Sequence, residues 1–171
     1  GLLIERSRTN LVQRSAEIDN AYWTKDNLTI SANAVTSPDG TTNADTLTDN
    51  STNGEHRFYA NLGAATGRSH SFFAKAGTAS FIDVTATGDT SCYATFNLST
   101  GAVAASLGGT ASIVPINNGW YRCKFEKTTV SGPWAMIRIG TTQAQALPGA
   151  TYVGTGSTVH FWGYQVEASA F

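Results

Sequence analysis

Three segments in the second half of the chain each carry a tryptophan with a second residue at an even spacing, an arginine in two of them and a tyrosine in the third, and these side chains could bind a sugar. In a β-strand, residues two apart point to the same face of the sheet. A flat aromatic ring stacks on the apolar C–H face of a sugar, and arginine donates hydrogen bonds to its hydroxyl groups. The candidate sugar-binding residues are Trp120, Arg122, Trp134, Arg138, Trp162 and Tyr164. Packing of these tryptophans under loops or against a neighbouring domain is the open alternative.

Glutamates near the two ends of the chain could hold a calcium ion. Glu17 lies in a polar N-terminal turn and Glu167 at the end of the last strand-like segment, so the two would meet if the termini are adjacent. Calcium prefers several carboxylate and carbonyl oxygens as ligands. Ordinary turn carboxylates are the alternative.

No catalytic motif stands out. The sequence has neither a G-x-S-x-G elbow nor an H-E-x-x-H pair. A glycosidase needs two carboxyl groups ~5–9.5 Å apart; Asp83 and Glu126 lie in strand-like segments, but solvated surface carboxylates are the simpler interpretation. We therefore expect a binding protein and not an enzyme.

The composition excludes several classes of protein. Of the 171 residues, 41% are hydrophobic and only 13% charged, which is too apolar for a disordered chain. The net charge of −1 gives no basic excess for nucleic acid, and no apolar run reaches the ~18 residues that insertion into a membrane needs. We expect one domain over 1–171, with 1–14 as an N-terminal lead-in segment, and we expect this domain to be a fragment of a longer chain.

Short strand-like segments separated by turn signals predict an all-β fold. Asn118-Gly119 is a strong hairpin signal. Helical patterns are nearly absent, and 15–23 and 39–47 are the only segments where a helical turn is expected. This spacing favours an antiparallel β-sandwich. The expected strands are 28–35, 56–62, 69–76, 80–86, 92–98, 102–107, 111–116, 120–129, 134–140 and 158–167.

Alternation within these strands separates a core face from an outer face. Tyr121, Cys123 and Phe125 share the predicted core face of one strand. Cys92 also lies in a strand-like segment, so a cross-strand disulfide with Cys123 is open, although two buried thiols are favoured.

Several motifs, in order along nearly the whole chain, resemble a module of phage tail and structural proteins. The opening GLLIERSRTNL at 1–11 carries the strongest resemblance. The others are EIDNAYWT at 17–24, PDGTTNAD at 38–45, FAKAG at 73–77, FNLSTG at 96–101, GWYR at 119–122 and WGYQVE at 162–167. The layout also resembles the jelly-roll carbohydrate-binding modules of families four, nine and twenty-two.

The resemblance implies a jelly-roll domain that binds a glycan on a concave sheet. It supports Trp120, Arg122, Trp134 and Arg138 as groove residues, and a structural calcium where the N-terminal turn meets the last strand. The implied function is recognition of a polysaccharide or cell-surface glycan receptor by a phage tail, fibre or other virion protein. Other domains of the same longer chain and a homotrimer are the further partners it suggests.

Two alternatives have the same fold. One is an accessory carbohydrate-binding module of a secreted bacterial polysaccharide-degrading enzyme, which would be extracellular and not part of a virion. The other is a purely structural virion domain that packs against neighbouring subunits. In the first case a catalytic domain would flank the module, and in the second no glycan would bind.

Overall fold

Nearly all regular structure in the computed structural model is β-strand. The structure describes residues 9–64, 67–86, 90–128 and 132–168. The strands are β1 (Thr24–Asp26), β2 (Leu28–Thr36), β3 (Thr42–Asp49), β4 (Asn53–Gly54), β5 (Arg57–Asn61), β6 (Arg68–Ala76), β7 (Phe81–Thr85), β8 (Tyr93–Asn97), β9 (Ala102–Leu107), β10 (Thr110–Pro115), β11 (Trp120–Lys127), β12 (Trp134–Gly140), β13 (Tyr152–Val153) and β14 (Thr158–Ala168). The helix α1 (Gln143–Ala146) interrupts them. No helix in the described residues is long and apolar enough to cross a membrane.

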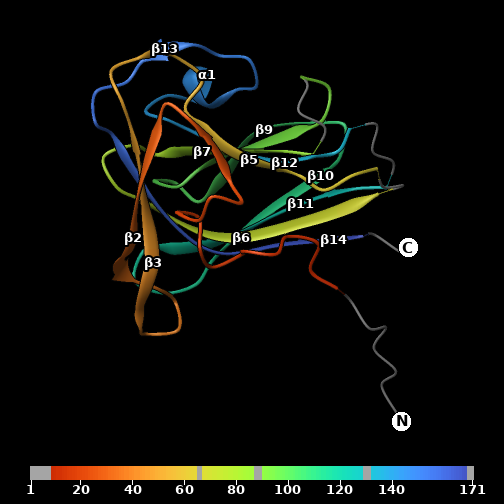
Figure 1. Cartoon of the computed structure of the whole chain (residues 1–171), viewed down its shortest axis with the longest axis horizontal. Coiled ribbons are helices and arrows are strands. Elements are labelled where there is room, and N and C mark those ends of the chain that lie inside the picture. Colours follow the sequence, from red (N-terminus) through yellow and green to blue (C-terminus); the bar gives the residue numbers. More distant parts are fainter. Residues whose placement is uncertain (1–8, 65–66, 87–89, 129–131, 169–171) are drawn as a thin grey trace.

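Two six-stranded antiparallel sheets pack face to face, which confirms the predicted β-sandwich (Figure 1). Sheet A has the order β10-β11-β6-β14-β3-β2, and sheet B has the order β1-β5-β12-β7-β8-β9. The chain crosses repeatedly between the sheets, as from β5 to β6 to β7, which is the jelly-roll arrangement. Each sheet therefore has an inner face toward the core and an outer face away from it.

Aromatic side chains fill the space between the sheets. Phe58 of sheet B packs edge-on against Phe161 of sheet A, with ring centroids 5.2 Å apart, and Phe72 stacks on Phe161 at 5.3 Å. All three side chains are fully buried. Since burying one such side chain contributes ~1.5–3 kcal/mol, this cluster fixes how the sheets pack.

Most of the predicted strands are confirmed, but one segment is not. Residues 39–47, where a helical turn was expected, lie mostly in β3. The threonines of this segment favour strand, and pairing between β14 and β2 decides its conformation. Helix α1, which was not predicted, begins with a capping box in which Thr142 accepts from the backbone of Gln145.

The predicted hairpin and thiols are confirmed. Asn118 and Gly119 have φ of 49° and 80° between β10 and β11, the left-handed conformation that a tight Asn-Gly turn needs. Cys92 and Cys123 are both buried and no disulfide joins them, so the favoured interpretation as thiols holds.

A β-bulge interrupts β14. The pairing with β6 shifts register between Trp162 and Gln165, and Gly163 in the bulge has a φ of 64°. The bulge inserts one residue, so the side chains of Phe161 and Tyr164 both lie in the core. The bulge thus decides which aromatic residues of β14 reach the surface.

Candidate functional site

The six candidate sugar-binding residues lie on two different sheets and do not form one groove. β11 and β14 belong to sheet A, whereas β12, which carries Trp134 and Arg138, belongs to sheet B. Outer faces of a sandwich point away from each other, so a ligand cannot contact both. Alternation along a strand shows which face each residue lies on but not which sheet the strand belongs to. The sequence analysis therefore placed residues of both sheets in one site.

The outer face of sheet A carries a pair of aromatic rings. Phe73 and Trp162 are directly opposite on β6 and β14, with ring centroids 5.2 Å apart and planes tilted by 52°. Both residues are half-buried, so each keeps part of its surface exposed. We call Phe73 and Trp162 the aromatic platform. Because strands hold it, little order has to be gained when a ligand stacks on it.

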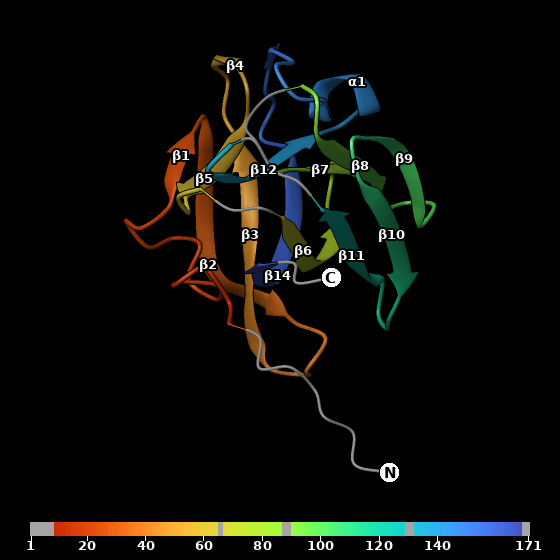
Figure 2. The same cartoon turned by 90° about the vertical axis from the view of Figure 1, so that its right-hand side faces the viewer.

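Trp120 lies at the edge of this outer face but is not accessible. Only 1% of its surface is exposed, and its Nε1 donates to the carbonyl of Thr36 at 3.1 Å. Thr36 ends β2, and the turn between β2 and β3 projects beyond the outer face of sheet A (Figures 1 and 2). The indole of Trp120 therefore packs under this hairpin and is not on the accessible part of the outer face, so its contact with a sugar stays a prediction.

Tyr164 is also misplaced by the sequence prediction. Its side chain is fully buried and its ring stacks on that of Trp23, with ring centroids 5.7 Å apart. Its hydroxyl lies 3.0 Å from His70 Nδ1. The bulge at Gly163 is the reason, because it shifts the alternation of β14 by one residue. Tyr164 belongs to the core and not to a binding face.

Polar side chains surround the aromatic platform. The exposed Arg122 lies opposite Phe73 on β11, and Lys75 lies between Trp120 and His160 in the next row across the sheet. His160 Nδ1 lies 2.9 Å from the hydroxyl of Thr46. Burial, together with the positive charge of Lys75, lowers the pKa of His160, so this imidazole is neutral at pH 7.

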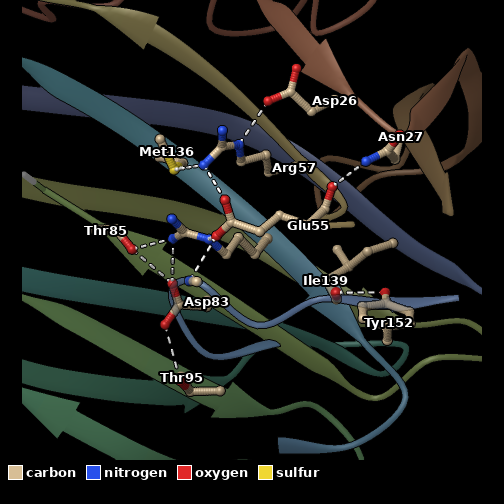
Figure 3. A network of polar contacts seen from close by, with 12 residues as sticks. Asp26, Asn27, Glu55, Arg57, Asp83, Thr85, Thr95, Met136, Ile139 and Tyr152 are labelled. Atoms are coloured by element: carbon tan, nitrogen blue, oxygen red, sulfur yellow. Dashed lines mark hydrogen bonds and ion pairs between the residues drawn. The ribbon is translucent and has the colours of Figure 1, made fainter. Parts of the chain in front are cut away.

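The outer face of sheet B is different, because its charged groups neutralise each other (Figure 3). Arg138 is 2% exposed and donates to Glu55 at 2.7 Å, to Asp83 at 3.3 Å and to Thr85 at 2.5 Å. Thr85 and Thr95 both donate to the carboxylate of Asp83. Arg138 therefore lies on the outer face as predicted, but its donors already bond Glu55, Asp83 and Thr85, and its sugar-binding role stays a prediction that this geometry does not favour.

The same network continues to the edge of sheet B. Arg57 forms an ion pair with Asp26 at 2.8 Å and another with Glu55. Glu55 also accepts from the backbone N–H of Gly149, in the segment that follows α1. The network thus joins the segment after α1 to sheet B, and its groups stabilise the fold more than they serve a ligand.

Trp134 remains half-buried on the same outer face. Its ring packs edge-on against Tyr59 at 5.4 Å, and the guanidinium of Arg57 lies 5.1 Å from the centre of the Tyr59 ring. This arrangement resembles the aromatic platform in its rings but differs in its charges, since Arg57 is paired with acids. Trp134 is therefore a matched comparison for Trp162.

No protein-family model matches this sequence, and no curated protein matches it. Among solved structures, the chain is similar to the enzymatically active domain of tailspike protein 4 of bacteriophage CBA120, with a TM-score of 0.50 and 14% identity over 92% of this chain. The match spans only 21% of that tailspike chain. The module TmCBM61, solved with β-1,4-galactotriose, gives a TM-score of 0.49 and 7% identity, covering 94% of this chain and 99% of the module. The tailspike likeness supports the sandwich fold, and the second is too distant to add to it.

The two glutamates expected to hold calcium are not paired with each other. The N-terminal segment does run along β14, but Asn10 lies opposite Glu167, and Ser15 accepts from the backbone N–H of Tyr164. Glu17 lies beyond Ser15 and forms an ion pair with Arg14 at 3.3 Å. The described residues contain no group of three or more His, Cys, Asp or Glu side chains that could hold a metal ion. Calcium binding stays a prediction without a site among these residues.

Two buried ionisable groups have strongly shifted pKa values. Burial raises the pKa of Asp83 to about 7, although Arg138 opposes this shift. Burial also lowers the pKa of His70 to about 3, and the charge of Arg68 adds to this effect. Folded Asp83 therefore keeps its proton to higher pH than an unfolded aspartate, and folded His70 stays neutral to lower pH than an unfolded histidine.

These shifts predict opposite slopes of stability with pH. The stability contributed by Asp83 is present below pH ~3.8 and is lost as pH rises through about 7. The stability contributed by His70 is present above pH ~6.5 and is lost as pH falls through about 3. Between pH 4.5 and 6.5 the two slopes cancel. We expect the free energy of unfolding of His70→Asn to fall by ~1 kcal/mol per pH unit as pH rises, and that of Asp83→Asn to rise by as much.

Urea denaturation at pH 4.5, 5.5 and 6.5 measures these slopes. The comparison uses slopes, so it holds even where a substitution lowers the overall stability. Parallel pH profiles for the native chain and both variants would show that neither group carries a shifted pKa.

Sequence reasoning missed Phe73 and Lys75. Phe72 and Phe73 are adjacent in β6, and two neighbouring residues of a strand point to opposite faces, so one ring had to lie outward. That signal was available. The position of Lys75 beside the platform depends on β6 lying between β11 and β14, which the sequence does not show.

Proposed function

We propose that this domain is a non-catalytic glycan-binding module whose site is the outer face of sheet A. The observation that carries the proposal is the aromatic platform, Phe73 and Trp162 at 5.2 Å, on an open sheet face beside the exposed Arg122. The rings present apolar surface for the C–H face of a sugar, and the neighbouring side chains donate hydrogen bonds to its hydroxyls. Binding is reversible, and no covalent step takes part.

The surroundings of the platform support a linear ligand more than a small molecule. The row Val114, Arg122, Phe73 and Trp162 crosses four neighbouring strands of sheet A. Strands lie ~4.8 Å apart, so this row extends over roughly 15 Å, the length of a few sugar units. We expect a single module to bind with a Kd of ~1 mM to 1 µM, which many copies on one particle would strengthen.

We further propose that the module recognises a host-surface glycan as part of a phage tail, fibre or other virion protein. This proposal is supported by the resemblance of the motifs along the chain and is compatible with the sandwich fold that a tailspike domain shares. An accessory module of a secreted bacterial polysaccharide-degrading enzyme would use the same face. The domains that flank the module in its parent protein distinguish the two.

Trp162→Ala is expected to weaken glycan binding by roughly five- to 150-fold, because an aromatic ring stacked on a ligand contributes ~1–3 kcal/mol. Trp134→Ala is the matched control, since it removes another half-buried tryptophan, from the opposite outer face. The 171-residue chain is screened on a glycan array, with calcium and with chelator, and hits are titrated by calorimetry with both variants. Loss of binding in Trp134→Ala alone would move the site to sheet B, and no binding to any multivalent glycan would overturn the proposal.

One observation favours the second candidate, a structural virion domain. The segment 98–119 contains no charged residue, and β9 and β10, which it includes, are the edge strands of the two sheets. Edge strands usually carry charges that prevent association. Here four large apolar side chains are exposed, namely Val103, Leu107, Val114 and Ile116. If no glycan binds, this edge is where a neighbouring subunit would pack.

A further inference from the structure

The charges on the outer face of sheet A are not balanced near the aromatic platform. Lys124 forms an ion pair with Glu126 at 3.0 Å, so that lysine is compensated. Lys75 and Arg122 have no carboxylate partner within the described residues. Of the other acids near this face, Glu167 is at the far end of β14, opposite Ser69. Asp39 lies in the turn between β2 and β3, where its carboxylate accepts hydrogen bonds from Ser37 and Thr41.

The two uncompensated cations flank one corner of the platform. Arg122 lies opposite Phe73, and Lys75 lies two residues further along the same strand β6. Residues in such diagonal positions of an antiparallel pair are ~7–8 Å apart, within reach of one anionic group for two long side chains. In this structure the stem of Lys75 lies over Gly119, on the side of Trp120 away from Arg122. To share an anion with Arg122, the lysine side chain changes its rotamer and turns back along β6 toward Phe73.

The positive charge of Lys75 affects a neighbouring group on this face. Its charge contributes to the lowered pKa of His160, its neighbour across the sheet. The neutral His160 adds no third charge, and it is bonded to Thr46. An anion near Lys75 and Arg122 would therefore meet two cations that form no ion pair in the described residues, although the whole chain has a net charge of −1.

We propose that the ligand of this face is an acidic glycan, whose carboxylate, sulfate or phosphate group lies between Arg122 and Lys75 while a sugar ring stacks on Trp162. This inference rests on the proposed function and names the class of glycan for the same site. Arginine matches the planar geometry of a carboxylate or the oxygens of a sulfate, and lysine adds a mobile point charge. The aromatic ring supplies the affinity that is common to neutral and acidic sugars.

Matched pairs of glycans test this inference. The probes are sialyllactose against lactose, oligogalacturonate against its methyl ester, and a sulfated galactan against its desulfated form. We expect the bound glycans to include an acidic member that binds at least about tenfold tighter than its neutral partner at low salt, with a preference that shrinks as salt screens the charges. The double variant Arg122→Gln/Lys75→Gln is expected to lose the preference, and the control Lys124→Gln, whose ammonium is already paired with Glu126, is expected to keep it.

The outcomes separate the two proposals. Equal binding of neutral and acidic partners, or a preference that survives in the double variant, would overturn the acidic class and leave the glycan-binding module standing. Binding of acidic glycans that persists in Trp162→Ala would show a non-specific charge effect and overturn the inference. No binding of any probe or array glycan would overturn the proposed function itself.

Discussion

Arg138→Met is expected to lower the free energy of unfolding by ~3–5 kcal/mol at pH 8, the usual loss when one partner of a buried ion pair is removed. The substitution keeps an apolar stem of similar length and removes the donors to Glu55, Asp83 and Thr85. Asp83, which is fully buried, would then lose the only cation that bonds it among the described contacts. Burial without a partner is costly for a carboxylate.

The size of this loss depends on pH in a defined direction. Burial already raises the pKa of Asp83 to about 7 in the presence of Arg138, whose charge lowers it. Without Arg138 the pKa rises further, so Asp83 in the variant is neutral at pH 5 and needs no cation. We therefore expect a clearly smaller loss at pH 5 than at pH 8, measured by urea denaturation. A loss that is equal at both pH values would show that the charge of Asp83 is not what Arg138 stabilises.

Arg138→Met also tests where the ligand binds. Under conditions in which the variant is folded, we expect its affinity for glycan to equal that of the native chain, because Arg138 lies on sheet B and is buried. Arg122→Met is the matched control for stability: the same substitution at an exposed position of sheet A should change the free energy of unfolding by less than ~0.5 kcal/mol.

Arg68→Met is expected to destabilise the domain by ~3–5 kcal/mol for a different reason. Arg68 is fully buried at one end of the sandwich and has no acidic partner in the described residues. Its guanidinium donates to backbone carbonyls of three separate connections. The acceptors are Gly63, Ala86, Gly132 and Trp134, the last two at 3.2 and 3.3 Å.

Each carbonyl left without a donor costs ~1–3 kcal/mol when water cannot reach it. Arg68→Lys is the informative second variant, because one ammonium cannot span the acceptors that a guanidinium fork reaches, so an intermediate loss is expected. Hydrogen exchange should become faster at Leu62, whose N–H bonds Pro133 beside this cluster. A loss below ~1 kcal/mol for Arg68→Met would mean that these connections hold their positions without it.

The sequence predicted the faces of strands well where alternation is regular. In β12, Ala135, Ile137 and Ile139 are fully buried as expected, and in β11 so are Cys123 and Phe125. Period-two patterning is a local property, so it survives in the absence of any tertiary information. The same pattern cannot tell which strands share a sheet, and so Trp134 was grouped with Trp162.

Burial on the outer faces was not predictable from local pattern. Trp120 is covered by the end of β2, which is 84 residues away in the sequence, and Arg138 is paired with Glu55 from 83 residues away. Contacts of this range depend on the topology of the sandwich. By contrast, a glycine inside a strand is a recognised sign of a bulge, and Gly163 could have warned that Tyr164 would turn inward.

Because of the bulge, the number of residues in β14 matters more for the orientation of its side chains than the residue types do. The one extra residue at Gly163 sets which side chains after it face inward, so a substitution in β14 leaves the orientation of the other side chains unchanged. A deletion of one residue there would instead turn Tyr164 and Val166 outward and bring Gln165 into the core. Related chains would therefore diverge by substitution along β14 while keeping its length.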